Sequence, residues 1–230
     1  MVTTHGDAGS TMASDLPAQG RAWATRRALL VAAATRFAEV GYHGTSLSEV
    51  ITACKVTKGA LYFHFISKQA LADAVVAEMV VGWKVMVAEV RTRGLDPLWT
   101  LLAQSDEAVA RVTNDPIARG GLQLLAEPRV VCADASAHYV YVEMVTTEQL
   151  TAATVAGMLR PGLDPARIAR VAVAMVTGVK PICDHVQGPE MLWNAITDLW
   201  QGLLPAIATD RWLEHWQATD WPRRPRPEIT

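Results

Sequence analysis

The stretch KVTKGALYFHFISKQAL, residues 55–71, sets four consecutive ring-bearing side chains between two lysines. Thr57 can accept a hydrogen bond from an orphan backbone N–H of the turn that follows it, so a very short helix is predicted from there through Phe63. Ser67 occupies the same position before the next run of helix-forming residues. The stretch therefore predicts a short helix, a turn and the start of a much longer helix.

Two helices are predicted before this stretch. Residues 23–42, WATRRALLVAAATRFAEVGY, repeat apolar residues every four positions and reach Gly41, where a left-handed cap ends a helix. The repeated positions are Leu29, Ala33 and Phe37. Residues 45–56, TSLSEVITACKV, begin with Ser46 and Glu49 as a capping box. The whole pattern predicts a helix-turn-helix, whose last short helix lies in the DNA major groove.

The side chains of the predicted recognition helix divide into two groups. Leu61 and Phe65 lie four residues apart and are predicted to hold this helix on the first one, with Phe63 packed in the same core. Tyr62 and His64 then point elsewhere, and we expect them to reach DNA phosphates.

The first turn of that helix carries Lys58 and Gly59, at the place where a helix-turn-helix meets base edges. Glycine has no side chain, which permits a close approach to the DNA. Lys68 follows Ser67 at the start of the next helix, where a cation and the helix N-terminus together favour a phosphate.

Charge is distributed unevenly along the chain. Residues 21–70 hold seven basic and two acidic side chains, a net charge of +5, whereas the whole chain of 230 residues carries −2. This asymmetry is expected of a small DNA-contacting module attached to an acidic domain. The overall charge excludes a wholly basic nucleic-acid coat.

The two ends lack helical periodicity. Residues 1–20 are interpreted as a disordered arm before the 21–70 module, and residues 216–230 as a tail. Residues 71–215 are predicted to form a helical bundle. The N-terminus lacks the pattern of a secretory signal, and no apolar run is long enough to span a bilayer. We therefore expect a cytoplasmic protein with no membrane partner.

The segments GY (41–42), TSLSEVI (45–51), VTKGALYFHF (56–65) and SK (67–68) resemble the DNA-binding domain of TetR-type repressors. VTKGALYFHF is most similar to the γ-butyrolactone autoregulator receptors of actinomycetes. The resemblance covers residues 26–72, and it implies an all-α homodimeric repressor whose larger C-terminal domain binds a small effector and then releases a palindromic operator. It also implies a set of DNA contacts: Thr45, Thr57, Lys58, Gly59, Tyr62, His64 and Lys68.

The sequence departs from the family at two positions. The family usually has glycine where this chain has Lys55, and a left-handed backbone there would strain a lysine. In the receptors a tryptophan commonly lies where this chain has Val142. An altered ligand is therefore implied, as in the pseudo-receptors, which respond to antibiotics or intermediates.

The region after residue 70 predicts a strongly apolar helical bundle. Its last two helices, within residues 165–208, are apolar on more than one face and are the predicted dimer interface. A two-fold dimer fits a palindromic operator with recognition helices about 34 to 36 Å apart.

Aromatic, methionine and polar side chains of this bundle are the predicted lining of an effector pocket. They are Trp83, Met86, Trp99, Gln123, Tyr139, Tyr141, Val142, Met144, Met175 and Thr177. Gln123, Tyr141 and Thr177 are the expected polar anchors for a γ-butyrolactone, furan, butenolide or antibiotic-like molecule.

An enzyme, a scaffold and a drug sensor are the alternatives to this function. The chain has no G-x-S-x-G elbow, phosphate loop or H-E-x-x-H motif, so we expect no enzyme activity, and we expect no cofactor and no metal. A pure scaffold would not need the cluster between Lys58 and Lys68. The alternative kept open is a multidrug-sensing TetR-type regulator of an efflux pump, for which only Glu127 and Glu143 offer acidic side chains near the predicted pocket.

Overall fold

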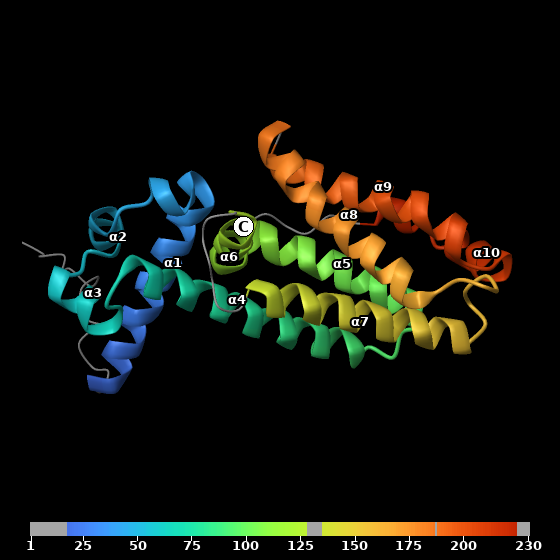
Figure 1. Cartoon of the computed structure of the whole chain (residues 1–230), viewed down its shortest axis with the longest axis horizontal. Helices are drawn as coiled ribbons and strands as arrows, with labels where there is room; N and C mark the ends of the chain where they lie inside the picture. The colour runs from blue at the N-terminus through green and yellow to red at the C-terminus, as the bar shows by residue number, and fades with distance from the viewer. Residues whose placement is uncertain (1–17, 128–134, 187, 225–230) are drawn as a thin grey trace, which may run out of the picture.

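The structure, a computed structural model, describes residues 18–127, 135–186 and 188–224. Within these ranges the chain forms ten α-helices, one short 3-10 helix and no strand, which confirms the all-α prediction. Figure 1 shows an elongated molecule with α1, α2 and α3 at one end and α4 running from that end along the body. The helices are α1 (Ala18–Gly44), α2 (Leu47–Cys54), α3 (Lys58–His64), α4 (Lys68–Arg91), α5 (Pro97–Asn114), α6 (Pro116–Ala126), α7 (Ala135–Val155), α8 (Pro165–Val186), α9 (Gly188–Ile207), α10 (Asp210–Ala218) and η1 (Trp221–Arg223).

Capping residues fix the starts of the helices at the predicted DNA-binding end. Ser46 accepts the Glu49 N–H at 3.2 Å while the Glu49 carboxylate accepts the Ser46 N–H at 3.0 Å, so the predicted capping box is confirmed. Thr57 accepts the N–H of Ala60 before α3, and Ser67 caps α4 in the same way. These caps leave only short connections between α2, α3 and α4.

Two backbone positions within the helix-turn-helix adopt conformations that L side chains disfavour. Gly41 (φ 72, ψ 178) breaks α1 close to its end, where the sequence predicts a helix stop. Lys55 (φ 54, ψ 37) is left-handed and ends α2, so the strain expected of a lysine at this turn is present.

One hydrophobic core joins the helix-turn-helix to α4 and α6. Phe37, Leu61 and Leu71 are fully buried in it, and α6 contributes Ile117 and Leu124. The predicted boundary at residue 70 therefore lies inside α4, and the core of residues 21–70 is completed by a helix from much later in the chain. The predicted arm, residues 1–20, lies outside the described residues up to position 17, and residues 18–20 already belong to α1.

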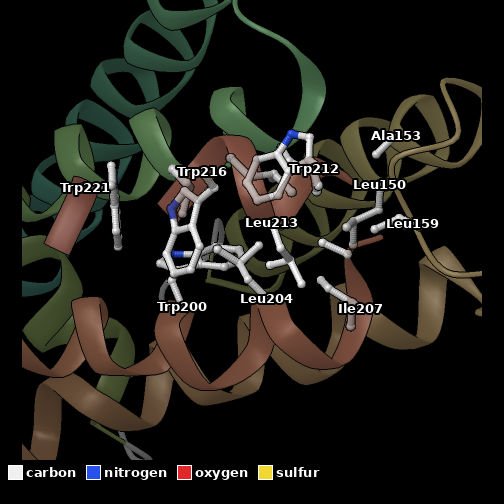
Figure 2. Close-up of a cluster of buried hydrophobic side chains, with 14 of the residues drawn as sticks. Leu150, Ala153, Leu159, Trp200, Leu204, Ile207, Trp212, Leu213, Trp216 and Trp221 are labelled. Carbon is white, nitrogen blue, oxygen red and sulfur yellow. The ribbon is translucent and has the colours of Figure 1, made fainter. Parts of the chain in front are cut away.

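A second core at the far end of the molecule is rich in tryptophan (Figure 2). Its indoles belong to Trp99, Trp193, Trp200, Trp212, Trp216 and Trp221. The last two fall within residues 216–230, which the sequence analysis assigned to a tail. The described part of that segment, residues 216–224, is instead packed on the bundle, because burying each large ring stabilises this placement. None of the described helices is long and apolar enough to cross a membrane.

Candidate DNA-binding surface and effector cavity

Only one face of the recognition helix α3 packs against the hydrophobic core. Leu61 is fully buried and Phe65 is nearly so, as predicted. Phe63 is 79% exposed, so its predicted place in the core is wrong. At about 100° per residue, a position midway between two buried residues four apart must point away from them. Phe63 is therefore a large apolar side chain on the surface of α3.

The outer face of α3 presents most of the predicted DNA contacts. Lys58, Gly59 and Tyr62 are exposed, and the Lys58 ammonium lies 5.9 Å from the centroid of the Tyr62 ring. His64, in the last turn, is half-buried. A cation beside an aromatic ring at the start of a short exposed helix is suited to a polyanion.

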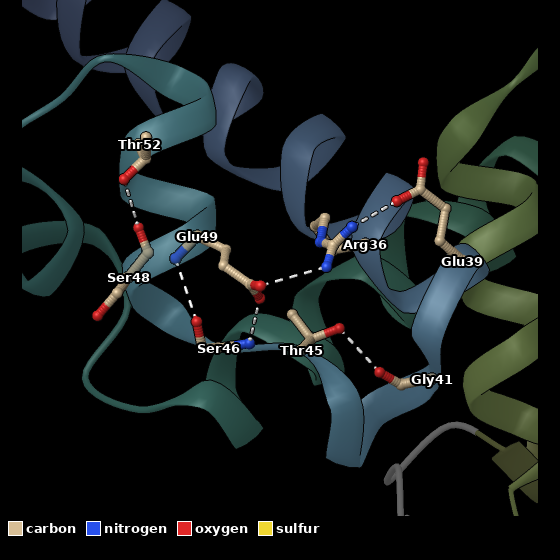
Figure 3. Close-up of polar contacts among 8 residues, drawn as sticks. All are labelled: Arg36, Glu39, Gly41, Thr45, Ser46, Ser48, Glu49 and Thr52. Carbon is tan, nitrogen blue, oxygen red and sulfur yellow. Dashed lines mark hydrogen bonds and ion pairs between the residues drawn. The ribbon is translucent and has the colours of Figure 1, made fainter.

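Thr45 differs from the other predicted contacts because its side chain is buried, with 3% of its surface exposed. Its hydroxyl donates to the carbonyl of Gly41 at 2.8 Å, as Figure 3 shows. The structure therefore gives Thr45 a place inside the turn between α1 and α2. Thr57 is similarly engaged, because its hydroxyl caps α3.

Arg36 links α1 to the start of α2. Its guanidinium contacts Glu39 at 2.7 Å and Glu49 at 3.3 Å (Figure 3). Hydrogen bonds from Ser46, with the nearby Arg36, lower the pKa of the Glu49 carboxyl from its usual value. This network links α1 to the first turn of α2.

Lys68 is half-buried at the start of α4, and its ammonium lies 4.4 Å from the centroid of the Tyr42 ring. Burial lowers the pKa of this lysine, and the neighbouring Glu127 carboxylate partly opposes that effect. Lys68 therefore lies where α1, α4 and the end of α6 meet.

The helical body encloses a cavity of about 530 Å³. Side chains from α4 to α9 line it, and none of these residues is Asp, Glu, Lys or Arg. Leu101, Val145, Ile196 and Trp200 are typical of the lining. The volume and the apolar walls match those of a small-molecule site.

Six of the ten predicted lining residues border this cavity: Trp83, Met86, Tyr139, Tyr141, Val142 and Thr177. The other four do not. Trp99 packs beside Trp212 in the tryptophan-rich core, and Met144 and Met175 are exposed. Gln123 is half-buried on α6 without bordering the cavity.

Two buried polar residues that the prediction missed border the cavity. Gln104 is 9% exposed and His138 is 3% exposed, and the Gln104 Nε2 and His138 Nδ1 atoms are buried without a hydrogen-bond partner. The sequence pattern could have indicated Gln104, because this residue lies three positions after Leu101 and therefore on the apolar side of α5. Unpaired buried polar atoms are costly, so each is a candidate contact for a ligand.

His138 is uncharged in this setting. Burial lowers the pKa of its imidazole to about 4. Its ring meets the Trp83 indole edge-on, with centroids 5.3 Å apart. The cavity therefore holds no charged side chain near neutral pH.

Comparison with known proteins agrees with this architecture. Residues 29–75 match the family of bacterial regulatory proteins named tetR. The chain is 31% identical to the A-factor receptor protein of Streptomyces griseus over 190 residues, which is 83% of this chain and 66% of that protein. The match thus spans just under two thirds of the relative's own length.

Two solved structures extend the likeness. TylP, a TetR regulator from Streptomyces fradiae, is 31% identical with a TM-score of 0.61, and the match covers 83% of this chain and 90% of TylP. A structure described as a gamma-butyrolactone receptor is 25% identical with a TM-score of 0.73, covering 83% and 92% of the two chains. A helix-turn-helix joined to a helical ligand-binding body defines a class of one-component transcriptional regulators. The chain belongs to the TetR family of these regulators, and is similar to its gamma-butyrolactone receptors.

Proposed function

We propose that the protein is a ligand-responsive repressor in the cytoplasm, which binds a palindromic operator through α1–α3 and releases it when a small signalling molecule enters the cavity. One observation carries this proposal. Trp83 of α4 borders the cavity and also packs against the core of the DNA-binding end. Ligand and DNA therefore act on the same helix.

The effector class follows from the chemistry of the cavity. A wall with no charged residue and mostly aliphatic and aromatic side chains favours a neutral, largely apolar molecule. The Gln104 amide can donate to a carbonyl oxygen, and neutral His138 can pair with a second polar group. A γ-butyrolactone, butenolide, furan or antibiotic-like compound of secondary metabolism meets these requirements, and the similarity to the solved gamma-butyrolactone receptor supports the lactone class.

A sensor of cationic drugs is less well supported. The two acidic residues considered for it lie elsewhere, because Glu127 contacts the backbone of α1 and Glu143 lies 3.6 Å from Arg170. Neither borders the cavity.

Homodimerisation is part of the proposal and is assigned to α8 and α9. Val171 and Met175 of α8 are exposed apolar side chains within residues 165–208. Leu199 packs partly against the tryptophan-rich core, so a charge there would disturb the fold as well as an interface. Val171→Glu is the sharper test, and we expect it to give monomers in sedimentation that no longer bind a palindrome.

Selection of bound DNA from a random pool, followed by titration of the complex, tests the function. We expect neutral lactones, furans or antibiotics to release the DNA, and Gln104→Leu to weaken that response while operator affinity stays at the wild-type level. Gln123→Leu is the matched control, because this glutamine does not border the cavity. Release by cationic dyes alone would favour the drug-sensor alternative, and absence of any selected sequence would contradict the proposal.

A further inference from the structure

Helix α6 separates the cavity from the DNA-binding end. Leu122 and Leu125 border the cavity and also pack against the core that contains α1. On the opposite side, a Cβ at Gly120 would lie 2.3 Å from the carbonyl oxygen of Ala34, so only glycine lets α6 approach α1 this closely. A molecule that fills the cavity therefore presses on a helix in direct backbone contact with α1.

The C-terminal end of α6 contacts the break in α1. The Glu127 carboxylate, which follows the last residue of α6, accepts the Tyr42 N–H at 2.7 Å. A Cβ at Gly41 would lie 2.6 Å from the same carboxylate oxygen. This hydrogen bond has a charged acceptor, which makes it stronger than a neutral one.

The two residues at this break, Gly41 and Tyr42, contact residues of the predicted DNA-binding surface. The Gly41 carbonyl accepts the Thr45 hydroxyl, which places the turn into α2. The Tyr42 ring lies under the ammonium of Lys68, a predicted phosphate contact. A shift of the Glu127 carboxylate would therefore move the turn before α2 and the support of Lys68 together.

We propose that Glu127 is a positioning residue. Its hydrogen bond to the Tyr42 N–H holds the α1 break in the DNA-binding arrangement, and this bond is lost when an effector displaces α6. This inference rests on the proposed function, and adds a named connection between the cavity and the operator. It differs from coupling through a tilt of α4 alone, because the Glu127 carboxylate binds the backbone of α1 directly. An effector acts here only through its different affinity for the held and released states.

The test compares Glu127→Ala, Glu127→Gln and Glu78→Ala. Glutamine keeps an oxygen that can accept the Tyr42 N–H, whereas alanine does not. Glu78 is the matched control, because its carboxylate also links to α1, at 3.4 Å from Arg27, and its removal changes the net charge equally. Amide hydrogen exchange at Tyr42, thermal unfolding and operator affinity are measured on the full chain.

We expect Glu127→Ala to speed exchange at Tyr42 at least tenfold and to lower operator affinity by a factor within about 5 to 150, the usual range of coupling between sites. Glu127→Gln should recover most of both properties, and Glu78→Ala should stay close to the wild type. A synthetic γ-butyrolactone with an aliphatic chain should speed Tyr42 exchange in the wild type and have little further effect on Glu127→Ala.

Two outcomes would overturn the inference, and a third would contradict the proposed function instead. Equal Tyr42 exchange in Glu127→Ala and Glu78→Ala would show that the contact does not hold the break, and would overturn the inference. A lower unfolding temperature with unchanged operator affinity would assign Glu127 a purely structural role and overturn it as well. Absence of DNA binding by the wild type would instead contradict the proposed function, while exchange at Tyr42 still decides whether the contact exists.

Discussion

The guanidinium of Arg224 binds the carboxylate of Asp106 through two hydrogen bonds, of 2.7 and 2.5 Å. Arg224 also stacks on two indoles, with its central carbon 4.0 Å from the Trp193 ring centroid and 3.4 Å from that of Trp221. The pair joins the end of the described chain to α5, next to the cavity-lining Ser105.

Breaking this pair should destabilise the protein. Only 12% of the Arg224 side chain and 25% of the Asp106 side chain are exposed, so Arg224→Gln leaves a largely desolvated carboxylate without its partner. We expect a loss of about 2 to 4 kcal/mol in unfolding free energy, measured by urea denaturation. Arg223→Gln, at an exposed neighbour, should cost less than about 0.5 kcal/mol. A similar small loss for both variants would contradict the assignment.

Gly120→Ala should be strongly destabilising. The added methyl group would overlap the backbone of Ala34, which has no freedom to rotate away. We expect a loss of about 1 to 3 kcal/mol or more, seen as a lower unfolding temperature. Gly202→Ala on α9, where a Cβ has open space, should instead be neutral or stabilising by up to about 1 kcal/mol. Equal behaviour of the two variants would show that α6 does not pack this closely.

Stability should depend on pH through His138. Its pKa falls from 6.5 to about 4 on burial, so between these values the unfolded chain binds the proton more readily than the folded one. Stability is therefore lost as pH falls from about 6.5 to about 4, by roughly 3 kcal/mol in total. His138→Phe should remove this part of the pH dependence, whereas exposed His215→Gln should keep it. An unchanged pH profile in His138→Phe would place the imidazole in contact with water.

Operator binding should depend on the exposed face of α3. Lys58→Ala and Tyr62→Ala are expected to lower affinity by about tenfold or more each without changing the unfolding temperature, because both side chains face away from the core. Because fewer counterions are released when the Lys58 cation is lost, Lys58→Ala should also reduce the slope of log affinity against log salt, by up to about 1. Arg211→Ala, on α10, is the control for lost charge. Wild-type affinity in the double variant Lys58→Ala/Tyr62→Ala would locate the DNA surface elsewhere.

The DNA-binding end was predictable because its signals are local. The Ser46 and Glu49 capping box and the capping residue Thr57 act within one helical turn, so a short stretch of sequence specifies them. Phe63 was placed wrongly because its hydrophobicity was given more weight than helix periodicity, which turns the position between Leu61 and Phe65 away from their buried face.

The cavity was less predictable because it depends on tertiary packing. Gln104 and His138 lie on different helices, and only the assembled bundle buries them at one cavity. The packing of residues 216–224 has the same origin: the partners of Arg224 include Asp106 on α5 and Trp193 on α9, far away in the sequence. Prolines and charges near the end of a chain gave no indication of those partners.

The contribution of α6 to the core around α1 limits how this protein can exchange parts with its relatives. A regulator of this architecture can be pictured as a DNA-binding domain joined to an exchangeable ligand-binding domain, with the boundary just after the helix-turn-helix. In this chain a boundary at residue 70 would remove Ile117 and Leu124 from the core of the DNA-binding domain, where both side chains are fully or nearly fully buried. A working chimera would have to inherit α6 together with α1, so recombination between relatives is expected to favour changes in α7 to α10 and to leave the first 127 residues as one inherited block.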